Sequence, residues 1–590
     1  MVALISCDQG DDLVSATSST NTVSNEPETD ISQHISKEIS GMVVTANPHA
    51  TDAGVAILEA GGSAVDAAIA IQSVLSLVEP QSSGLGGGGF MVFLNAETKQ
   101  ISVYDGREKA PAGATKDMFI HESGEPMSFF EAKNSGVSIG VPGIVSLLEL
   151  AHKDQGKLAW ALLFDDAIDL AERGFDVSPR LNDFLLRFER FIPSEEKDGP
   201  LDAYNYFYEA PGKPKTRLVN QEYARTLNLI KENPGHFYEG ELAQALIAAA
   251  NTEPRSGTLS LEDLSGYKAR KLEPLCFRYR TNTLCGPPPP SSWVAVAMTL
   301  GILEQTPQFG AEQVANESEE SNYEDWHIFA EAMRLAYADR DHYVADDEFV
   351  DVPLKGMLNQ EYLKGRAANI DPSGAASSIS FGQPPETESS ARRLGKDTTD
   401  EQAGTTHFTV VDSDGNVVSM TSSVESLFGS TRMAGGMFLN NQLTDFARIP
   451  EDTEGKVPAN IVEPGKRPRS SMSPTIVVDK NGDFLLSTGS PGGNSIIAYN
   501  LKTLVAVLDW GMTPQQAVEL PNMIARGDKV SIEQGRASPE LIESLRSYGF
   551  NVKESGGENS GLSMIMRTSD GSLIGGVDPR REGTIGIPHE

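Results

Sequence analysis

The spacing of apolar residues changes several times along this chain, and each change predicts a different element. From Gly41 onward the pattern alternates between helix and strand. Residues 51–60 have helical spacing and end at a Gly-Gly pair, and residues 63–77 are alanine-rich, with Ser63 as a suitable N-cap. The segment FMVFLNAETKQISVYDG has instead the pattern of a strand, a turn and a second strand. Further helices are expected at residues 158–173, 242–250 and 326–339.

A β-hairpin is predicted by the run HFTVV, a polar turn and the run VVSMTSS. An Asp-Gly pair at 414–415 lies between the two runs, and such a pair favours a two-residue turn. In that register Thr405 lies opposite Val424 and Thr406 opposite Ser423, to within one residue, because strand ends are poorly defined by sequence. A hydroxyl group is therefore expected beside Thr405.

A second hairpin is predicted in the run KRPRSSMSPTIVVDKNGDFLLSTGSPGG, where an Asn-Gly pair at 481–482 marks another tight turn. Counting outward from this turn places Ser471 opposite Gly492. Both hairpins then present polar or glycine residues at their open ends. A site at one rim of two stacked antiparallel sheets requires this arrangement.

The residues before Thr405 differ in composition from the hairpin that follows. Residues 371–404 are rich in Ser, Gly, Pro and charge, and such a segment cannot bury enough apolar surface to fold alone. It is expected to be a flexible linker that ends at Gly404. By itself, the Gly404–Thr405 dipeptide indicates only a boundary between a loop and a strand.

The composition indicates a globular protein that does not bind nucleic acid. The 590 residues are 39% hydrophobic, which is enough for a substantial core, and their formal net charge is −35. Binding to phosphates needs clustered Lys and Arg, so the acidic balance argues against a nucleic-acid partner. No apolar run in the sequence approaches the roughly 20 residues of a membrane helix.

The first residues resemble an export signal. Residues 4–7 (LISC) are similar to the lipobox of bacterial lipoproteins, although the apolar stretch is short and no basic region precedes it. Residues 1–36 are therefore expected to be a signal remnant followed by a disordered tether. We expect an exported bacterial protein that is periplasmic or anchored by lipid at Cys7 to the cell envelope.

Several patterns associated with other kinds of site carry little weight. Gly84, Gly86 and Gly89 fit GxGxxG, but a helix precedes them and a strand follows, so close backbone packing is expected instead of dinucleotide binding. The acidic residues near 339–347 have no repeated ligand spacing, so a solvated helix end is expected instead of a metal site. No GxSxG elbow is present, and His407 is expected to be structural.

Two of the three cysteines leave an open question. Cys276 and Cys285 lie in neighbouring predicted strands, where they either form a bridge across a turn or remain as two buried free thiols. The sequence does not distinguish these alternatives.

A threonine at this junction has a known route to reactivity. A hydroxyl needs a neighbouring base, and a free α-amino group, with a pKa of about 8 against roughly 10.4 for lysine, suits that role near neutral pH. Thr405 is internal in the translated chain. The chemistry therefore requires that the Thr405 hydroxyl attack the Gly404 carbonyl and that water then hydrolyse the ester.

Several motifs, in order along the chain, resemble the gamma-glutamyltransferase family. The motifs similar to the family's large subunit are MVVTANPHATDAGVAILEAGGSAVDAAIA, EPQSSGLGGGGFMVF, DGREKAPA, SIGVPG and AEAMRLAYADR. The motifs similar to the family's small subunit are GTTHFTVVDSDGNVVSMT, LNNQLTDF, KRPRSSMSPTIVV and STGSPGG. The resemblance runs from about Gly41 to the C-terminus.

The resemblance implies an N-terminal nucleophile hydrolase, an α/β protein with a four-layer αββα sandwich of two stacked, mainly antiparallel sheets. Autocleavage would yield a large subunit of residues 37–404 and a small catalytic subunit of residues 405–590, which stay together as a heterodimer. The enzyme would transfer the γ-glutamyl group of substrates such as glutathione to water or to an amino acid or peptide acceptor. The resemblance implies no cofactor and no metal.

The resemblance also assigns roles to individual residues. Thr405 matches the nucleophile and Ser423 the hydroxyl that orients it, while Gly492 and Gly493 match the backbone amides of the oxyanion hole. The other matches form a pocket for a zwitterionic γ-glutamyl group. They are Arg107, Ser470 and Ser471 for the α-carboxylate, Gln442 and Asp445 for the α-ammonium, and Glu425 where other members have Asn or Glu.

Two departures from the family pattern concern specificity. Trp293 stands where the family commonly continues with glycines, and residues 447–469 contain no Tyr or Trp, so the aromatic lid of some members is not expected. One alternative within the family is a glutaryl or cephalosporin acylase, against which Glu425, Gln442 and Asp445 argue. The other is a non-catalytic ligand-binding lipoprotein. Loss of Thr405 or of the glycine pair would have indicated this alternative.

Overall fold

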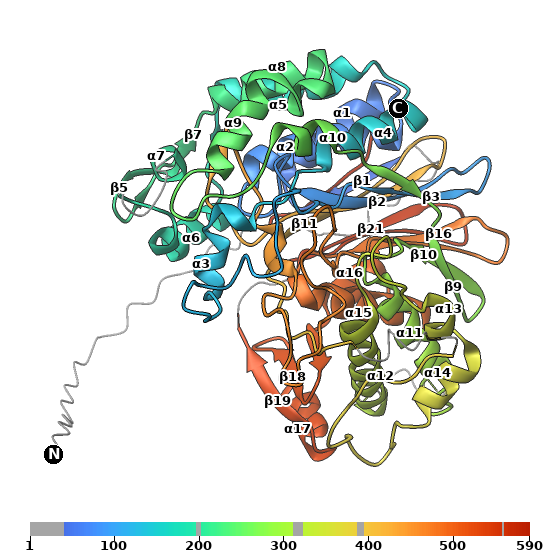
Figure 1. Cartoon of the computed structure of the whole chain (residues 1–590). Coiled ribbons are helices and arrows are strands. Elements are labelled where there is room, and N and C mark those ends of the chain that lie inside the picture. Colours follow the sequence, from blue (N-terminus) through green and yellow to red (C-terminus); the bar gives the residue numbers. More distant parts are fainter. Residues whose placement is uncertain are drawn as a thin grey trace, which may run out of the picture.

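The computed structural model describes residues 41–195, 202–310, 323–385, 387, 394–556 and 560–589. The expected signal remnant and tether, residues 1–36, lie outside the described residues. In Figure 1, strands of two sheets cross the middle of the molecule, and helices lie above the upper sheet and below the lower one.

The upper sheet has seven strands, and every pair of neighbours in it is antiparallel. The strand that begins at the junction lies near its centre. The order is β22 (Thr584–Gly586), β1 (Met42–Thr45), β11 (Gly404–Val411), β12 (Val417–Glu425), β2 (Gly88–Leu94), β3 (Ile101–Asp105) and β8 (Arg270–Leu272).

The lower sheet has six strands and is also antiparallel throughout. It combines strands from before and after the junction. The order is β21 (Leu573–Val577), β20 (Ser563–Arg567), β16 (Phe484–Gly489), β15 (Thr475–Val478), β10 (Asn282–Gly286) and β9 (Leu275–Tyr279).

Alternating apolar residues on the strands produce the layers. In β1, Val43 packs against the upper helices, whereas its neighbour Val44 packs between the sheets. In β2, Met91 and Val92 divide in the same way. A third apolar cluster joins the lower sheet to its helices. Since successive strand residues point to opposite faces, both faces of each sheet are covered, and the expected αββα sandwich is confirmed.

Most predicted helices are present. Helix α1 spans Pro48–Glu59, and α2 spans Ala64–Val78 with Ser63 as its N-cap. The predicted helix at 158–173 is divided into a 3₁₀ turn and α5 (Asp165–Arg173). The other predicted helices are α9 (Gly240–Ala250) and α12 (Tyr323–Tyr343).

The remaining helices surround these layers. They are α3 (Phe129–Lys133), α4 (Ile144–Gln155), α6 (Pro179–Phe188), α7 (Asp202–Phe207), α8 (Gln221–Glu232), α10 (Leu261–Gly266), α11 (Trp293–Glu304), α13 (Leu354–Met357), α14 (Gln360–Ala367), α15 (Ile496–Leu508), α16 (Pro514–Glu519) and α17 (Pro539–Ser547). Smaller sheets are formed by β4 (Phe175–Asp176) with β7 (Arg217–Leu218), β5 (Tyr208–Ala210) with β6 (Lys213–Pro214), β13 (Met433–Ala434) with β14 (Met437–Phe438), and β17 (Met523–Arg526), β18 (Lys529–Glu533) and β19 (Asn551–Ser555).

The first hairpin has a three-residue loop instead of the predicted two-residue turn. The N–H of Asp412 donates to the carbonyl of Asn416 at 3.0 Å, and Gly415 has φ 81° at the last loop position. The Asp412 carboxylate also accepts hydrogen bonds from two backbone N–H groups across the loop, which stabilises it. The predicted register was therefore wrong by one residue, and Thr405 lies opposite Ser423.

The second hairpin likewise closes with a three-residue loop, between Asp479 and Asp483. A β-bulge in β16, at Leu485, then adds one residue, and this restores the predicted register farther along the strands. The paired part of β15 and β16 ends before Ser471 and Gly492 are reached. The predicted pairing of these two residues therefore lies beyond the hydrogen-bonded strands.

The glycine-rich segment before β2 allows backbones to approach closely, as predicted. A Cβ atom at Gly86 would lie 2.1 Å from the carbonyl oxygen of Phe438, and one at Gly89 would lie 2.6 Å from that of Thr421. These contacts leave no space for a side chain.

The acidic cluster at the end of α12 is mostly buried, so the predicted solvated helix end was wrong. Asp339 and Asp346 are both fully buried. Asp339 forms an ion pair with Arg366 at 3.2 Å, and Asp346 accepts a hydrogen bond from the N–H of Arg467 at 2.7 Å. Partners distant in the sequence make this burial possible. The described residues contain no group of three or more His, Cys, Asp or Glu suited to a metal ion.

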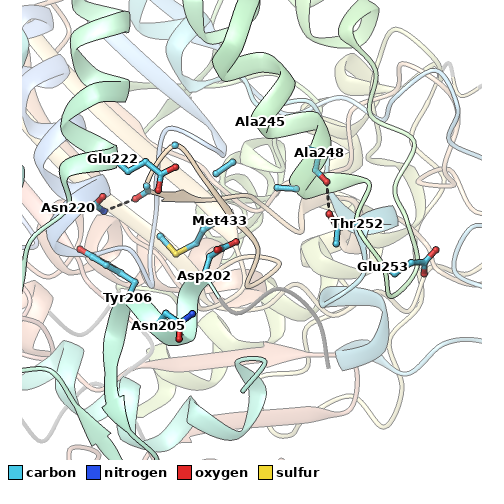
Figure 2. Close-up of a pocket in the computed structure, with 14 residues that line it drawn as sticks. Asp202, Asn205, Tyr206, Asn220, Glu222, Ala245, Ala248, Thr252, Glu253 and Met433 are labelled. Carbon is cyan, nitrogen blue, oxygen red and sulfur yellow. Dashed lines mark hydrogen bonds between the residues drawn. The ribbon is translucent and has the colours of Figure 1, made fainter. Parts of the chain in front are cut away.

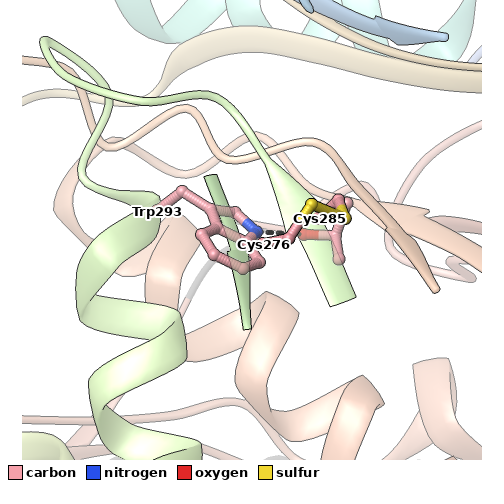
Figure 3. The surroundings of a disulfide bond; sticks show 4 residues. Cys276, Cys285 and Trp293 are labelled. Atoms are coloured by element: carbon pink, nitrogen blue, oxygen red, sulfur yellow. Dashed lines mark hydrogen bonds between the residues drawn. A yellow bond between two sulfur atoms is a disulfide. The ribbon is translucent and has the colours of Figure 1, made fainter. Parts of the chain in front are cut away.

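Cys276 and Cys285 form a disulfide bond between β9 and β10, with an S–S distance of 2.01 Å (Figure 3). The two residues lie directly opposite each other on the paired strands.

Trp293, which departs from the family pattern, begins α11 nearby and is fully buried. Its indole N–H donates to Thr475 Oγ1 at 3.0 Å, which joins α11 to β15.

Candidate active site

Thr405 is the second residue of β11, and the fold buries it with only 3% of its surface exposed. Its Oγ1 lies 3.1 Å from Ser423 Oγ on the neighbouring strand β12. The register of the two strands shifts between Gly404 and Thr405, at the start of the ladder. The predicted hydroxyl beside Thr405 is confirmed, and Ser423 supplies it.

The hydrogen bonds of Ser423 determine the direction of proton transfer at the junction. Ser423 Oγ donates to the carbonyl oxygen of Gly404 at 2.9 Å and accepts from the N–H of Glu425 at 2.8 Å. Because the single Ser423 hydroxyl hydrogen is used for Gly404, the Thr405 hydroxyl donates to Ser423 Oγ. A proton leaving Thr405 can therefore pass through Ser423 to the Gly404 carbonyl oxygen.

The packing at the junction excludes a side chain at position 404. A Cβ atom on Gly404 would lie 2.2 Å from the carbonyl carbon of Ser426 and 2.4 Å from the carbonyl oxygen of Glu425. Both of these atoms belong to backbone, which cannot move aside as a flexible side chain does. The fold therefore requires glycine immediately before Thr405.

One small polar pocket brings together all the predicted site residues except Gly492 and the cleavage-site residue Gly404. The free space in it is only about 10 Å³, roughly one water molecule. Gly492 directly precedes the lining residue Gly493 in the sequence. The predicted residues that line the pocket are Arg107, Thr405, Ser423, Glu425, Gln442, Asp445, Ser470, Ser471 and Gly493.

One wall of the pocket has acceptor atoms without partners. Gln442 Nε2 donates to Asp445 Oδ2 at 2.6 Å, and Arg107 Nη2 forms an ion pair with the same oxygen at 2.7 Å. Within the described structure, the buried atoms Gln442 Oε1 and Asp445 Oδ1 have no hydrogen-bond partner. Because buried acceptors are costly to leave unpaired, this wall is suited to a donor such as an ammonium group.

Glu425 adds a second carboxylate to this pocket. It ends β12 with φ 79°, a conformation that is strained for a residue other than glycine and is often found at functional sites. Burial raises the pKa of Glu425, and burial together with the nearby Glu425 charge raises the pKa of Asp445 well above its usual range. A cation bound near both carboxylates would stabilise their ionised forms.

The residues just before the junction, expected to form a flexible linker, pack into the same pocket. The Glu401 carboxylate accepts a hydrogen bond from the N–H of Ser471 at 2.9 Å and forms an ion pair with Arg340. The N–H of Gln402 donates to Glu425 Oε1 at 3.1 Å. Composition did not indicate this packing, because the partners are distant in the sequence.

Two neighbouring residues complete the surroundings of Thr405. Arg581 was not among the predicted residues, yet its Nη1 donates to the carbonyl oxygen of Thr405 at 3.0 Å and Glu79 lies 3.8 Å from it. No short motif marks Arg581, since it is 176 residues from Thr405. His407 is buried and bonded to Thr421 Oγ1, and burial lowers its pKa to about 3, which agrees with the predicted structural role.

A larger cavity, of about 610 Å³, shares no lining residue with the pocket at Thr405. Figure 2 shows the residues that line this cavity. Residues of α7, α8, α9 and the β13–β14 hairpin line it, and acidic side chains such as Asp202, Glu222 and Glu253 occur on its walls. None of the predicted site residues is among its lining residues. The small pocket at Thr405 is therefore the candidate active site.

Residues 50–587 match the family model for gamma-glutamyltranspeptidase, which is most of the chain. The chain belongs to the gamma-glutamyltranspeptidase family. In the described part of this family member, no helix has the length and apolar character needed to cross a membrane.

Relatives of this gamma-glutamyltranspeptidase family member carry two kinds of name. The glutathione hydrolase proenzyme of Escherichia coli (strain K12) is 37% identical over 553 residues, 92% of this chain and 90% of that protein. The one from Bacillus subtilis (strain 168) is 35% identical over 93% of this chain and 91% of that protein. The acylase ACY 1 proenzyme of Pseudomonas sp. (strain V22) is 34% identical over 92% of this chain and 93% of that protein.

Solved structures show the same division. The cephalosporin acylase from Bacillus halodurans has a TM-score of 0.79 and 25% identity, with 97% of this chain and 99% of that chain covered. The gamma-glutamyltranspeptidase of Helicobacter pylori has a TM-score of 0.53 and 30% identity, with 62% of this chain and 99% of that chain covered. The chain is thus an enzyme of this family. Which of the two activities it has must be inferred from the chemistry of its pocket.

Proposed function

We propose that this protein is a gamma-glutamyltransferase with glutathione hydrolase activity. The observation that carries the proposal is the pair of buried, unpartnered acceptors, Gln442 Oε1 and Asp445 Oδ1, in the described pocket that contains Thr405. A γ-glutamyl group carries an α-ammonium that can donate to both atoms, whereas a glutaryl group has no donor at that position. The acidic wall therefore favours γ-glutamyl substrates over those of an acylase.

The proenzyme activates itself at the junction. Thr405 Oγ1 attacks the Gly404 carbonyl while its proton passes to Ser423, and the carbonyl oxygen takes up the proton that Ser423 already directs at it. Collapse of this intermediate re-forms the carbonyl and breaks the C–N bond, while the hydroxyl proton passes to the Thr405 nitrogen. An ester between Gly404 and the Thr405 oxygen remains. Water hydrolyses the ester, and Thr405 then has a free α-amino group as its base.

In turnover the mature Thr405 hydroxyl attacks the γ-amide carbonyl of the substrate and transfers its proton to the α-amine. The backbone N–H groups of Gly492 and Gly493 stabilise the oxyanion, an effect of about 10² to 10³ in rate for each donor. The leaving amine takes up the proton, and a γ-glutamyl ester remains on Thr405. Water resolves this ester in hydrolysis, and an amino acid or peptide amine resolves it in transpeptidation.

After the cut, the two subunits remain together as a heterodimer. In the upper sheet, β11 lies between β1 of the large subunit and β12 of the small one, and β12 pairs in turn with β2. In the lower sheet, β10 of the large subunit pairs with β15 of the small one. Separating the subunits would break both sheets, so cleavage of one peptide bond does not release either subunit.

The substrate class is tested by comparing γ-glutamyl-p-nitroanilide with glutaryl-p-nitroanilide, which lacks only the α-ammonium. The wild type is expected to prefer the γ-glutamyl compound. In Asp445→Asn, kcat/KM for the γ-glutamyl compound is expected to fall by about thirtyfold or more, because a buried charged partner of the ammonium is lost. The glutaryl compound, measured in the same variant, is the control and should not show this loss. A wild type that prefers the glutaryl compound would instead be an acylase.

Arg581 is expected to position the nucleophile without binding substrate. In Arg581→Gln the Thr405 carbonyl loses its charged donor, and a small displacement of the nucleophile should lower kcat by about tenfold to a hundredfold. KM should change little, because Arg581 does not line the pocket. Steady-state kinetics measures both constants, and Arg536→Gln, at a more exposed arginine, is the matched control. A change confined to KM would rule out the positioning role.

We also propose that the protein acts outside the cytoplasm. The Cys276–Cys285 disulfide supports this location, because such bonds persist mainly in oxidising compartments, and the LISC sequence at residues 4–7 is consistent with lipid attachment at Cys7. Fractionation of bacterial cells that express the full chain should recover it with the cell envelope. Cys7→Ser should move it to the soluble fraction if the lipid anchors it. Recovery of the wild type from the cytosol alone would contradict export.

A further inference from the structure

Lys133 is buried at the end of α3, and in the described structure it forms no ion pair. Its Nζ donates to the carbonyl oxygen of Leu427 at 3.0 Å. Within the described residues this is the only hydrogen bond of its ammonium group, which has three N–H donors. The other lysines buried in that part of the chain are better satisfied, since Lys466 forms an ion pair with Glu463 and Lys502 donates to three acceptors.

The charge of Lys133 is costly to the fold. Burial lowers the pKa of Lys133 to about 8, although the nearby charge of Glu425 raises it, so the ammonium group remains charged at neutral pH. A buried charge without a close partner destabilises a protein, and a methionine of similar length would avoid this cost. Proteins retain such destabilising groups mainly where function needs them. Lys133 is therefore a candidate for a role at the nearby pocket.

The carbonyl that Lys133 holds belongs to a strained turn, residues 425–431, that follows β12. In this turn Glu425, Phe428 and Thr431 have φ angles of 79°, 63° and 61°. Only six residues other than glycine have positive φ in the described structure, so half of them lie here. Such conformations persist only where the surrounding structure holds them. Among the described residues, Lys133 is the one charged side chain that donates to the backbone of the turn, and charge-assisted hydrogen bonds are stronger than neutral ones.

The turn determines where a pocket carboxylate lies. Glu425 is its first residue and lines the pocket that contains Thr405. The side chain of Asn441 donates to the Glu425 carboxylate and accepts from the N–H of Ser426, at 3.0 Å, in the same turn. The Glu425 side chain and the turn backbone are thus held by the same groups. A movement of the turn would therefore move the carboxylate within the pocket.

The two carboxylates of this pocket differ in the cations that stabilise them. Asp445 has Arg107 at 2.7 Å, whereas Glu425 forms no ion pair in the described structure. The charge of Glu425 acts instead on two cations at longer range, Lys133 and Arg448. Arg448 is only partly buried, so water and salt screen it more than they screen Lys133. Lys133 is thus the buried positive charge that favours an ionised Glu425.

We propose that Lys133 is a positioning residue for the γ-glutamyl donor, because it holds the strained turn and keeps Glu425 ionised and directed at the α-ammonium of the substrate. It contacts no substrate itself and acts through Glu425. The inference rests on the proposed function, since it concerns the donor of that same reaction. It explains why an active-site wall made of carboxylates has a costly buried lysine beside it.

The first test is Lys133→Met, assayed with γ-glutamyl-p-nitroanilide. KM should rise by about tenfold or more, because ammonium binding is weakened, while kcat should stay within about twofold. Lys133→Arg keeps the charge and should recover part of the loss. The Tm of Lys133→Met, measured by scanning calorimetry, should not fall, since a costly buried charge is removed. A merely structural role would lower Tm and kcat together, and that result would overturn the inference.

Lys502→Met is the matched control. Lys502 is also fully buried, but it is not among the lining residues of the pocket. Its ammonium donates to the Leu520 carbonyl and to Asn522 Oδ1, both at 2.8 Å. Methionine would leave these acceptors unpaired, so Tm should fall while KM stays unchanged. If KM rose in Lys502→Met as much as in Lys133→Met, the effect would not be specific to the turn, and the inference would fail.

A double-mutant cycle shows whether Lys133 acts through Glu425. Glu425→Gln keeps the shape of the side chain and removes its charge, and its KM should rise by at least as much as that of Lys133→Met. Adding Lys133→Met to Glu425→Gln should then raise KM no further. Equal fold increases in both backgrounds, or an unchanged KM in Glu425→Gln, would overturn the inference. A wild type that is inactive on γ-glutamyl-p-nitroanilide would overturn the proposed function as well, so the two failures are distinguishable.

Discussion

Replacing Thr405 with alanine is expected to leave the chain as one uncut polypeptide and to reduce γ-glutamyl turnover by about 10⁴-fold or more. The variant lacks the oxygen that lies 3.1 Å from Ser423 Oγ. In the proposed mechanism that oxygen attacks Gly404 in the proenzyme and carries the γ-glutamyl group in the mature enzyme, so one substitution should remove both reactions. A denaturing gel should show fragments ending at residue 404 and beginning at residue 405 in the wild type only.

Thr405→Ser is the matched control for this result. It keeps the oxygen and, after cleavage, the α-amine, so it should still mature and turn over substrate. Both steps should be slower, because serine lacks the methyl group that restricts the χ1 rotamer of threonine. An uncut wild-type chain that turned over γ-glutamyl-p-nitroanilide would contradict the mechanism based on an N-terminal amine. Cleavage of Thr405→Ala at the same bond would show that another group makes the cut.

Gly404→Ala is expected to block maturation although it changes neither the nucleophile nor its base. The added Cβ atom would lie 2.2 Å from the Ser426 carbonyl carbon, so the junction must shift away from β12. This shift displaces the Gly404 carbonyl from the Ser423 hydroxyl that donates to it at 2.9 Å. Cleavage should slow by about a hundredfold, the scale expected for a displacement near 1 Å. The time course of subunit appearance on a denaturing gel measures it.

A glycine in open space provides the control for this substitution. A Cβ atom at Gly365, within α14, would meet no heavy atom within 4 Å. Gly365→Ala should therefore mature at the wild-type rate and stabilise the protein by up to about 1 kcal/mol through its helix propensity. If Gly404→Ala matured as fast as Gly365→Ala, the contact with Ser426 would have no role in cleavage.

Local patterns predicted much of the fold, because the interactions that produce these patterns are themselves local. Ser63 caps α2 through a bond to the N–H of Asp66, three residues away. The strand-turn-strand pattern of FMVFLNAETKQISVYDG is likewise present, as β2 and β3. The αββα arrangement and the roles of the site residues came from resemblance to a family, since no pattern within the hairpins indicates γ-glutamyl chemistry.

Turn chemistry was predicted less accurately, and the reason lies in side chains at the edge of each turn. An Asp-Gly or Asn-Gly pair favours a two-residue turn, but in both hairpins an aspartate before the loop accepts backbone hydrogen bonds across it. This stabilises a three-residue loop with the glycine in its last position. This shift of the register by one residue decided that Ser423, and not Val424, lies opposite Thr405.

The sequence by itself predicted a hydroxyl on the strand that pairs with Thr405, and its resemblance to a family predicted the cleavage junction and Thr405 as the nucleophile. Only the tertiary structure decided that Cys276 and Cys285 form a bond, that Arg581 contacts Thr405, and that Glu401 lines the same pocket as Thr405. The physical reason is that burial of a charge depends on a partner brought close by packing. Glu401 and Arg340 are 61 residues apart in the sequence, and no local pattern indicates that they meet.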